Sequence, residues 1–158
     1  MTDEQIALAR RAVACRGWKW MPGMEFDLHG AGHLSGGWRI QSVQMRALDK
    51  WSTPVRTITA GPCEFIIAPR GGIHVRYVDQ IGHSMSLNPL AATMLPFLED
   101  HATLGCLLAL VREALDSPRV HVLYVEGLYR WECADNRTVH GVGATEAEAL
   151  LETLEYAP

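Results

Sequence analysis

Residues 100–115, DHATLGCLLALVREAL, and residues 143–156, GATEAEALLETLEY, decide the fold that this sequence predicts. Each stretch opens with a helix start signal: Asp100 is a residue type common at the N-cap, and Thr145 with Glu148 matches a capping box. Behind each signal, apolar residues recur at helical spacing. The helix at 102–115 is apolar on several sides, so we expect it to be largely buried. We expect the following core residues: Leu107, Leu108, Val111, Leu150, Leu151 and Leu154.

Two strand-like runs, 120–125 and 128–134, lie between these helices and are separated by Glu126 and Gly127. Residues 138–142 are placed to pair back on them. Earlier runs rich in β-branched and aromatic residues predict four more strands, at 38–43, 55–60, 63–68 and 73–78. The sequence therefore predicts helices layered on antiparallel sheets.

A further helix is expected at 2–16, where Thr2 and Gln5 form a capping box and Gly17 is a stop signal. The predicted fold class is α+β: antiparallel sheets packed with three main helices, an α/β sandwich with a C-terminal helix–strand–strand–helix unit. At 158 residues the chain is predicted to form one domain over 1–158.

Within this domain, 98–158 is expected to form the sandwich-like half and 27–97 a variable insert of strands and loops. The insert begins with a glycine-rich stretch at 27–37, which we expect to be a loop. Residues 79–98 contain two prolines and show little periodicity, so a loop with one short helical turn near 90–94 is expected there.

The composition excludes several classes of protein. A formal net charge of −4 argues against a protein that binds the phosphate backbone of a nucleic-acid duplex. No apolar run approaches the roughly 20 residues that span a bilayer, and no secretory signal is recognised, so we expect no membrane association. The cysteines, which are Cys15, Cys63, Cys106 and Cys133, form no C-x-x-C pair and are expected to be reduced thiols of a cytoplasmic protein.

Three stretches are similar to known sequences: LARRAVACRGWKWMPGM (8–24), ATLGCLLALVREAL (102–115) and GATEAEALLETLE (143–155). They resemble small uncharacterised proteins of bacteriophage and prophage genomes, and the C-terminal part is similar to the bacteriophage ABA-sandwich type. The resemblance implies a phage origin, an α/β sandwich and a location in the cytoplasm of the infected or lysogenic host. It includes no catalytic signature, so it transfers no functional residue to this chain.

An aromatic segment follows the first predicted helix and is the best candidate for a binding site. Trp18 and Trp20 alternate with Lys19 and would point the same way in an extended chain. Tryptophan and methionine can form a stacking pocket for a base or an apolar groove for a partner, or they can cap one end of the core. With arginines that pair with anionic groups, the candidate ligand-binding residues are Trp18, Trp20, Met24, Arg39, Arg70 and Arg76.

The glycine-rich stretch also offers Asp27, His29 and His33 as a weak alternative metal site, although solvated loop histidines explain the same pattern. No established zinc signature accompanies them, so neither a metal nor a cofactor is expected. No nucleophile elbow, P-loop or dinucleotide fingerprint occurs in the sequence, and Cys63 beside Pro62 is expected to be a buried or edge-facing thiol. No catalytic residue is therefore predicted.

Together these patterns favour a phage-encoded, non-enzymatic binding protein, with counteraction of a host defence as its context. It would sequester a small nucleotide-derived signal or mask a host protein. A homo-oligomer fits this hypothesis, because small sequestering proteins often enclose a ligand between subunits. Two alternatives remain: a small metal-dependent hydrolase that uses Asp27, His29 and His33, and a virion or assembly accessory protein.

Overall fold

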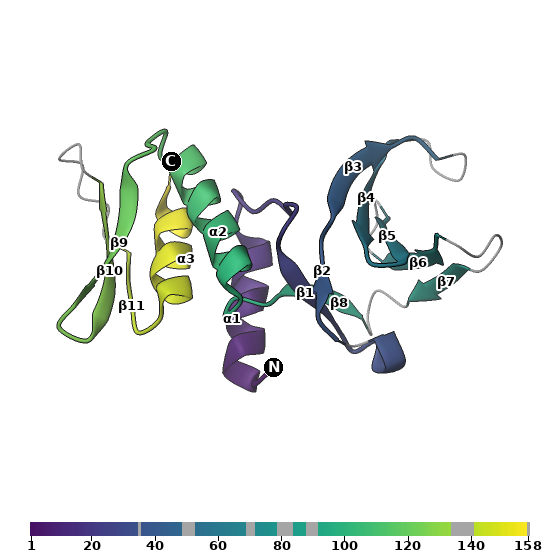
Figure 1. Cartoon of the computed structure of the whole chain (residues 1–158), viewed down its shortest axis with the longest axis horizontal. Helices are drawn as coiled ribbons and strands as arrows, with labels where there is room; N and C mark the ends of the chain where they lie inside the picture. Colours follow the sequence, from purple (N-terminus) through teal and green to yellow (C-terminus); the bar gives the residue numbers. More distant parts are fainter. Residues whose placement is uncertain are drawn as a thin grey trace. The chain divides into compact units, whose positions relative to one another are not determined.

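The chain divides into two compact units in the computed structural model, which describes residues 1–34, 36–48, 53–68, 72–78, 84–87, 92–133 and 141–157. The helical unit comprises Met1–Lys19 and Leu98–Pro158, and the strand unit comprises Trp20–Phe97. Three helices and three antiparallel sheets make up the described residues (Figure 1), which confirms the predicted α+β class. No helix among these residues has both the length and the apolar composition needed to cross a membrane.

The three helices of the helical unit begin where local capping chemistry places them. Their bounds are α1 (Asp3–Ala14), α2 (His101–Ala114) and α3 (Glu146–Tyr156). The side chains of Thr2 and Thr145 each accept a hydrogen bond from the third helical residue, and both capping boxes are complete. Asp100 accepts from the backbone N–H of Thr103 at 2.8 Å. All three predicted helix starts are therefore confirmed.

One antiparallel sheet completes the helical unit, in the order β11-β10-β9. Its strands are β9 (Val120–Val125), β10 (Leu128–Cys133) and β11 (Val142–Gly143). The helices lie on one face of this sheet (Figure 1). A Cβ atom on Gly143 would come within 2.6 Å of the backbone nitrogen of Ala149, so glycine at this position allows α3 to pack closely against β11.

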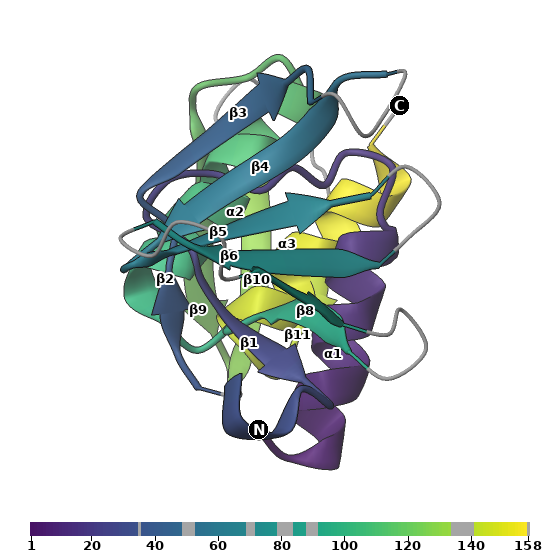
Figure 2. The same cartoon turned by 90° about the vertical axis from the view of Figure 1, so that its right-hand side faces the viewer.

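The strand unit contains the other two sheets, whose strands are labelled in Figure 2. The smaller sheet has the order β2-β1-β8, with β1 (Glu25–His29), β2 (Trp38–Arg39) and β8 (Thr93–Pro96). The larger is a meander of β3 (Ser42–Arg46), β4 (Val55–Ala60), β5 (Cys63–Ile67), β6 (Ile73–Tyr77) and β7 (Ser84–Leu87). A 3-10 turn, η1 (Gly32–Leu34), separates β1 from β2.

Aromatic side chains join the two sheets of the strand unit. The ring of Phe65 on β5 lies 5.1 Å from that of Phe26 on β1 and 5.2 Å from that of Trp38 on β2, both in edge-to-face geometry. Phe26 and Phe65 are fully buried. Because edge-to-face pairs are favourable beyond their buried area, this cluster fixes how the sheets pack.

Three sequence-based predictions in the strand unit were wrong. Residues 27–29 belong to β1 rather than to a loop, because Phe26 and Leu28 alternate into the core while Asp27 does not. The prediction that 79–98 is a loop with a helical turn near 90–94 is wrong where these residues are described, because Ser84–Leu87 forms β7 and Thr93–Pro96 is the strand that pairs with β1. Residues 79–83 and 88–91 lie outside the described part of the chain. The expected strand 38–43 is split into β2 and β3 at Ile40, whose N–H donates to the carbonyl of Met24 at 2.8 Å.

The predicted core of the helical unit is confirmed except at Leu108. Leu107, Val111, Leu150, Leu151 and Leu154 are buried. Leu108 is only half-buried, because it lies next to the exposed positions Gly105 and Ala109 of α2. The expectation that α2 is largely buried is therefore wrong: its outer positions are exposed, at Ala102, Gly105 and Ala109.

Candidate functional site

One face of the five-stranded sheet collects polar side chains, whereas the opposite face carries Phe65 and the core. The strand register pairs Thr59 with Glu64 and Glu64 with Arg76, so these three side chains share a face. The same register places the buried apolar side chains of Val55 and Ile66 on this face, and it adds the polar residues at alternate positions of β3, β4 and β6. We call this set the polar sheet face: Ser42, Gln44, Arg46, Thr57, Thr59, Glu64, His74 and Arg76.

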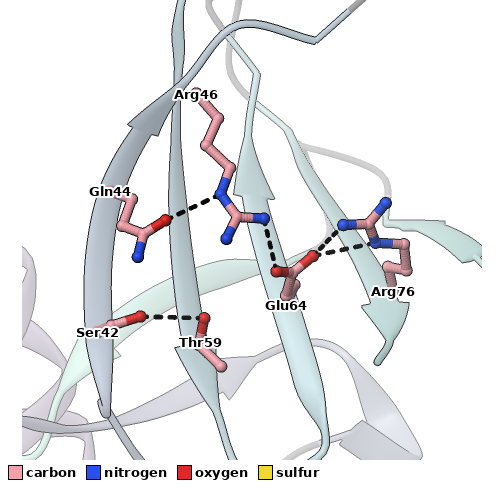
Figure 3. Close-up of polar contacts among 6 residues, drawn as sticks. All are labelled: Ser42, Gln44, Arg46, Thr59, Glu64 and Arg76. Carbon is pink, nitrogen blue, oxygen red and sulfur yellow. Dashed lines mark hydrogen bonds and ion pairs between the residues drawn. The ribbon is translucent and has the colours of Figure 1, made fainter. Parts of the chain in front are cut away.

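Glu64 is the centre of this face and is almost fully buried, with 8% of its side chain exposed. One carboxylate oxygen, Oε1, accepts from Nη1 of Arg46 at 2.9 Å. The other, Oε2, accepts from Nε of Arg76 at 3.0 Å and also from Nη2 of Arg76. Nε of Arg46 in turn donates to Gln44 at 2.9 Å. Figure 3 shows this Arg46–Glu64–Arg76 cluster, built across three strands.

The cluster carries a net positive charge, because two guanidinium groups face one carboxylate. The side chains of Arg46 and Arg76 remain 40% and 46% exposed. Nη2 of Arg46 and Nη1 of Arg76 have no hydrogen-bond partner among the described residues. Glu64 therefore holds both guanidinium groups in place and leaves donors on each for a further anion.

Hydroxyl groups lie beside the cluster on β3 and β4. Ser42 Oγ donates to Thr59 Oγ1 at 3.2 Å (Figure 3). Thr57 is 2% exposed, and its Oγ1 has no hydrogen-bond partner within the described part of the chain. A buried hydroxyl normally finds a partner, so the polar sheet face has hydrogen-bonding capacity that the described contacts do not use.

Comparisons with protein-family models, with curated proteins and with solved structures find no match for this chain. The resemblance to phage proteins therefore stays a prediction. The inference of a function depends on the chemistry of the polar sheet face.

The aromatic residues predicted to bind a ligand are placed in or beside the core. Trp20 and Met24 are 9% and 0% exposed, and Trp20 packs edge-on against Phe26 at 5.9 Å. Trp18 is also 9% exposed but belongs to the helical unit, whereas Trp20 belongs to the strand unit. Their burial favours the alternative in which they cap the core, and their role in binding stays a prediction.

Of the two described arginines that the sequence named, Arg39 and Arg76, Arg76 lies in the cluster and Arg39 does not. Arg39 on β2 donates to the carboxylate of Glu25 on β1 at 2.6 Å and to the carbonyl of Gly23, which precedes β1, at 2.8 Å. Arg70 lies outside the described residues. Sequence reasoning missed Arg46 and Glu64. The available signal was Glu64 itself, a charge inside the apolar run of β5.

The alternative metal site is partly described. Asp27 and His29 share the side of β1 that faces away from the core, and Asp27 Oδ1 accepts from the N–H of Gly36 at 2.7 Å. The side chain of His33 lies outside the described residues. Within the described residues, no three His, Cys, Asp or Glu side chains are grouped to hold a metal ion. The site stays a prediction that elemental analysis can test.

The described thiols are poorly suited to nucleophilic chemistry. Cys63 is fully buried. Burial raises the pKa of the Cys106 thiol, with a smaller contribution from Asp100. Burial also raises the pKa of the Cys15 thiol, and the charge of Glu155 adds to this effect while Arg11 opposes it. Because the thiolate is the reactive form, the raised pKa makes Cys15 and Cys106 less reactive at neutral pH than an ordinary thiol.

We therefore expect slow alkylation of Cys15 and Cys106 by iodoacetamide in the native protein near pH 7.5. A raised pKa shifts the onset of the reaction to higher pH, so the rates should still be rising above about pH 10, where an ordinary thiol is close to its plateau. Peptide mapping by mass spectrometry reads each site separately, with unfolded protein as the reference. Native rates equal to the unfolded rates at neutral pH would contradict this expectation.

Proposed function

We propose that this protein is a non-enzymatic binding protein whose ligand is a phosphate-bearing nucleotide held on the polar sheet face. The observation that carries the proposal is the Arg46–Glu64–Arg76 cluster. Its guanidinium groups are fixed by a buried carboxylate, stay partly exposed and keep donors that no described residue uses. Guanidinium groups match the geometry of phosphate oxygens, and a fixed pair loses little side-chain entropy on binding.

The neighbouring hydroxyl groups support a ligand that is polar beyond its phosphate. Ser42 and Thr59 can exchange their mutual hydrogen bond for bonds to a sugar or phosphate oxygen, and His74 shares the same face. The Ser42 hydroxyl is bonded to another hydroxyl rather than to a base, which does not activate it as a nucleophile. This chemistry favours binding over catalysis.

The biological context that we propose follows from the resemblance to phage proteins. A phage protein that binds a nucleotide without consuming it can sequester a signal that the infected or lysogenic host uses in defence. The alternative within the same class is the masking of a host protein, for which the cluster would pair with acidic side chains.

A panel of linear and cyclic nucleotides, measured by thermal shift and isothermal titration calorimetry, tests the proposal. At least one nucleotide should raise the melting temperature, with an affinity that falls as salt is added. Arg76→Lys and Arg46→Lys keep the charge but lose the planar fork, so each should weaken binding about 10- to 100-fold, the equivalent of about 1.5–3 kcal/mol.

Arg56→Lys is the matched control. Arg56 is an exposed residue of β4 whose register places it on the opposite face of the same sheet, so its replacement should leave the affinity unchanged. Equal losses in all three variants, or no nucleotide that shifts the melt, would contradict the proposal. Capture of one host protein from lysate would then favour masking. Stoichiometric metal would favour the metal-dependent hydrolase. Recovery of the protein from purified phage particles would favour the virion or assembly accessory protein.

A further inference from the structure

The free edge of β9 carries an inference about assembly that does not depend on the ligand. β9 is the outer strand of its sheet, and its sequence VHVLYV is apolar at every position except His121. It contains no proline, no lysine and no acidic residue, which are the usual means by which an edge strand avoids pairing with another chain. An edge of this composition is typical of a strand that has a partner.

The backbone groups at this edge follow from the hairpin that joins β9 to β10. Glu126 and Gly127 form a two-residue turn with φ of 52° and 85°, so Val125 and Leu128 are the first hydrogen-bonded pair. Alternation along the strand then directs the N–H and C=O groups of Val122 and Tyr124 away from β10. Neither residue has a backbone partner on that side among the described residues.

An arginine marks where the free part of the edge ends. The outward carbonyl of Val120 accepts two hydrogen bonds from Arg112 of α2, from Nε at 3.0 Å and from Nη2 at 2.9 Å. This contact confirms the alternation, because Val120 belongs to the same outward set as Val122 and Tyr124. It also leaves four groups that have no partner in the described part of the chain, the N–H and C=O of those two residues.

Apolar side chains flank these four groups. Tyr124 and Val125 are 66% and 36% exposed at the end of β9. Leu104 and Leu108 precede Arg112 by two turns and one turn of α2, so they lie in the same row, on the side of the helix that reaches the edge. Both leucines are only half-buried. The free edge and this row of leucines form one apolar surface, and proteins seldom leave a continuous apolar surface exposed to water.

We propose that β9 pairs antiparallel with β9 of a second copy of this chain, about a two-fold axis at Leu123. Val122 then lies opposite Tyr124 of the partner subunit, and the reciprocal pair completes four backbone hydrogen bonds. The two copies of Leu123 meet at the axis. The two sheets join into one, and the Leu104–Leu108 rows of both α2 helices cover each other above the seam.

Other registers use the edge less well. An axis at Val122 requires the carbonyl of Val120, which Arg112 already occupies. An axis at Tyr124 places Val122 opposite Glu126, which has a turn conformation with φ of 52° and cannot continue a strand. The axis at Leu123 alone pairs all four free groups, and it places a β-branched residue opposite an aromatic one, which is a favourable cross-strand pair.

The charges at the two ends of the seam also match in this register. Val120 faces Glu126 of the partner subunit, so the guanidinium group of Arg112 and the neighbouring Arg119 approach that carboxylate. Two-fold symmetry repeats the arrangement at the other end. A self-complementary pattern of this kind, with opposite charges that meet at both ends, favours a second copy over an unrelated strand.

Light scattering with size-exclusion chromatography, together with sedimentation equilibrium, tests the proposal on the full chain. The wild type should have about twice the mass of one 17.5 kDa chain at tens of micromolar. Leu123→Arg places two positive charges at the axis and should raise the dissociation constant at least 100-fold. Val142→Arg is the matched control. Val142 is 40% exposed and lies on the same face of the sheet as Leu123, but it belongs to β11, away from the seam, so this variant should remain a dimer.

A charge exchange keeps the test decisive if Leu123→Arg does not fold. Arg119→Glu and Glu126→Arg alter exposed residues, and each should weaken the dimer about tenfold, whereas the double variant should recover most of the affinity. A wild-type monomer at 200 µM would overturn the proposal. A dimer that tolerates Leu123→Arg, or single charge variants that do not weaken it, would also overturn it.

Discussion

Phe65→Ala is expected to destabilise the strand unit by about 3–5 kcal/mol. Phe65 is fully buried and makes edge-to-face contacts with Phe26 and Trp38, which belong to the other sheet. Truncation to alanine removes the buried ring and both of its aromatic contacts. The two sheets then lose the side chain that fills the space between them. The remaining cavity adds to the cost because a sheet interface relaxes only partially.

Urea unfolding followed by tryptophan fluorescence measures this loss, since Trp38 touches the altered site. Met45→Ala is the control: the register places Met45 on the same face of the sheet, but it is 64% exposed on the edge strand β3. Its replacement should change the free energy of unfolding by less than about 0.5 kcal/mol. If Phe65→Ala cost no more than Met45→Ala, the aromatic cluster would not be the core of this unit.

Helix starts and short hairpins could be predicted because their chemistry is local. A capping box such as that of Thr145 and Glu148 involves residues three positions apart, and it forms in the structure as expected. The same holds for the pair β9 and β10, because Gly127 suits the positive φ that this two-residue turn requires, and Glu126 adopts it beside the glycine. In each case the residues that decide the structure are neighbours in the sequence.

Long-range pairing could not be predicted in this way. β8 pairs with β1, so Leu95 lies opposite Asp27, and prolines near β8 hide its strand character. The Arg46–Glu64–Arg76 cluster has the same origin. Arg46 and Glu64 belong to different strands, and only the register of the four strands from β3 to β6 brings both arginines to one carboxylate. Without knowledge of that register, a reader of the sequence sees only that Glu64 is a single charged residue in an apolar run.

The aromatic segment shows a different limit. Trp20 and Met24 suit a stacking pocket and a core equally well by composition, because both environments are apolar. The contact of Trp20 with Phe26 is what places it beside the core of the strand unit. Burial of this kind depends on which distant surface covers a side chain, and periodicity does not carry that information.

Leu150→Ala should cost the helical unit about 2–5 kcal/mol, because Leu150 is fully buried on the side of α3 that faces the core. Leu108→Ala is the control for the effect of burial. Leu108 carries the same side chain on a neighbouring helix but is half-buried, so its truncation should cost only about 1 kcal/mol in dilute solution.

Protein concentration distinguishes these two variants further. The cost of Leu150→Ala arises within one chain and should not depend on concentration. The cost of Leu108→Ala should grow as the protein is concentrated, because Leu108 gains a partner across the proposed β9 seam and the wild type is then stabilised by association. Denaturation by urea at 1 µM and at 100 µM, followed by circular dichroism at 222 nm, measures both effects. Equal costs for the two variants at 1 µM would show that the burial of α2 differs from the arrangement described above, whereas a concentration-independent cost for Leu108→Ala would separate this leucine row from the dimer seam.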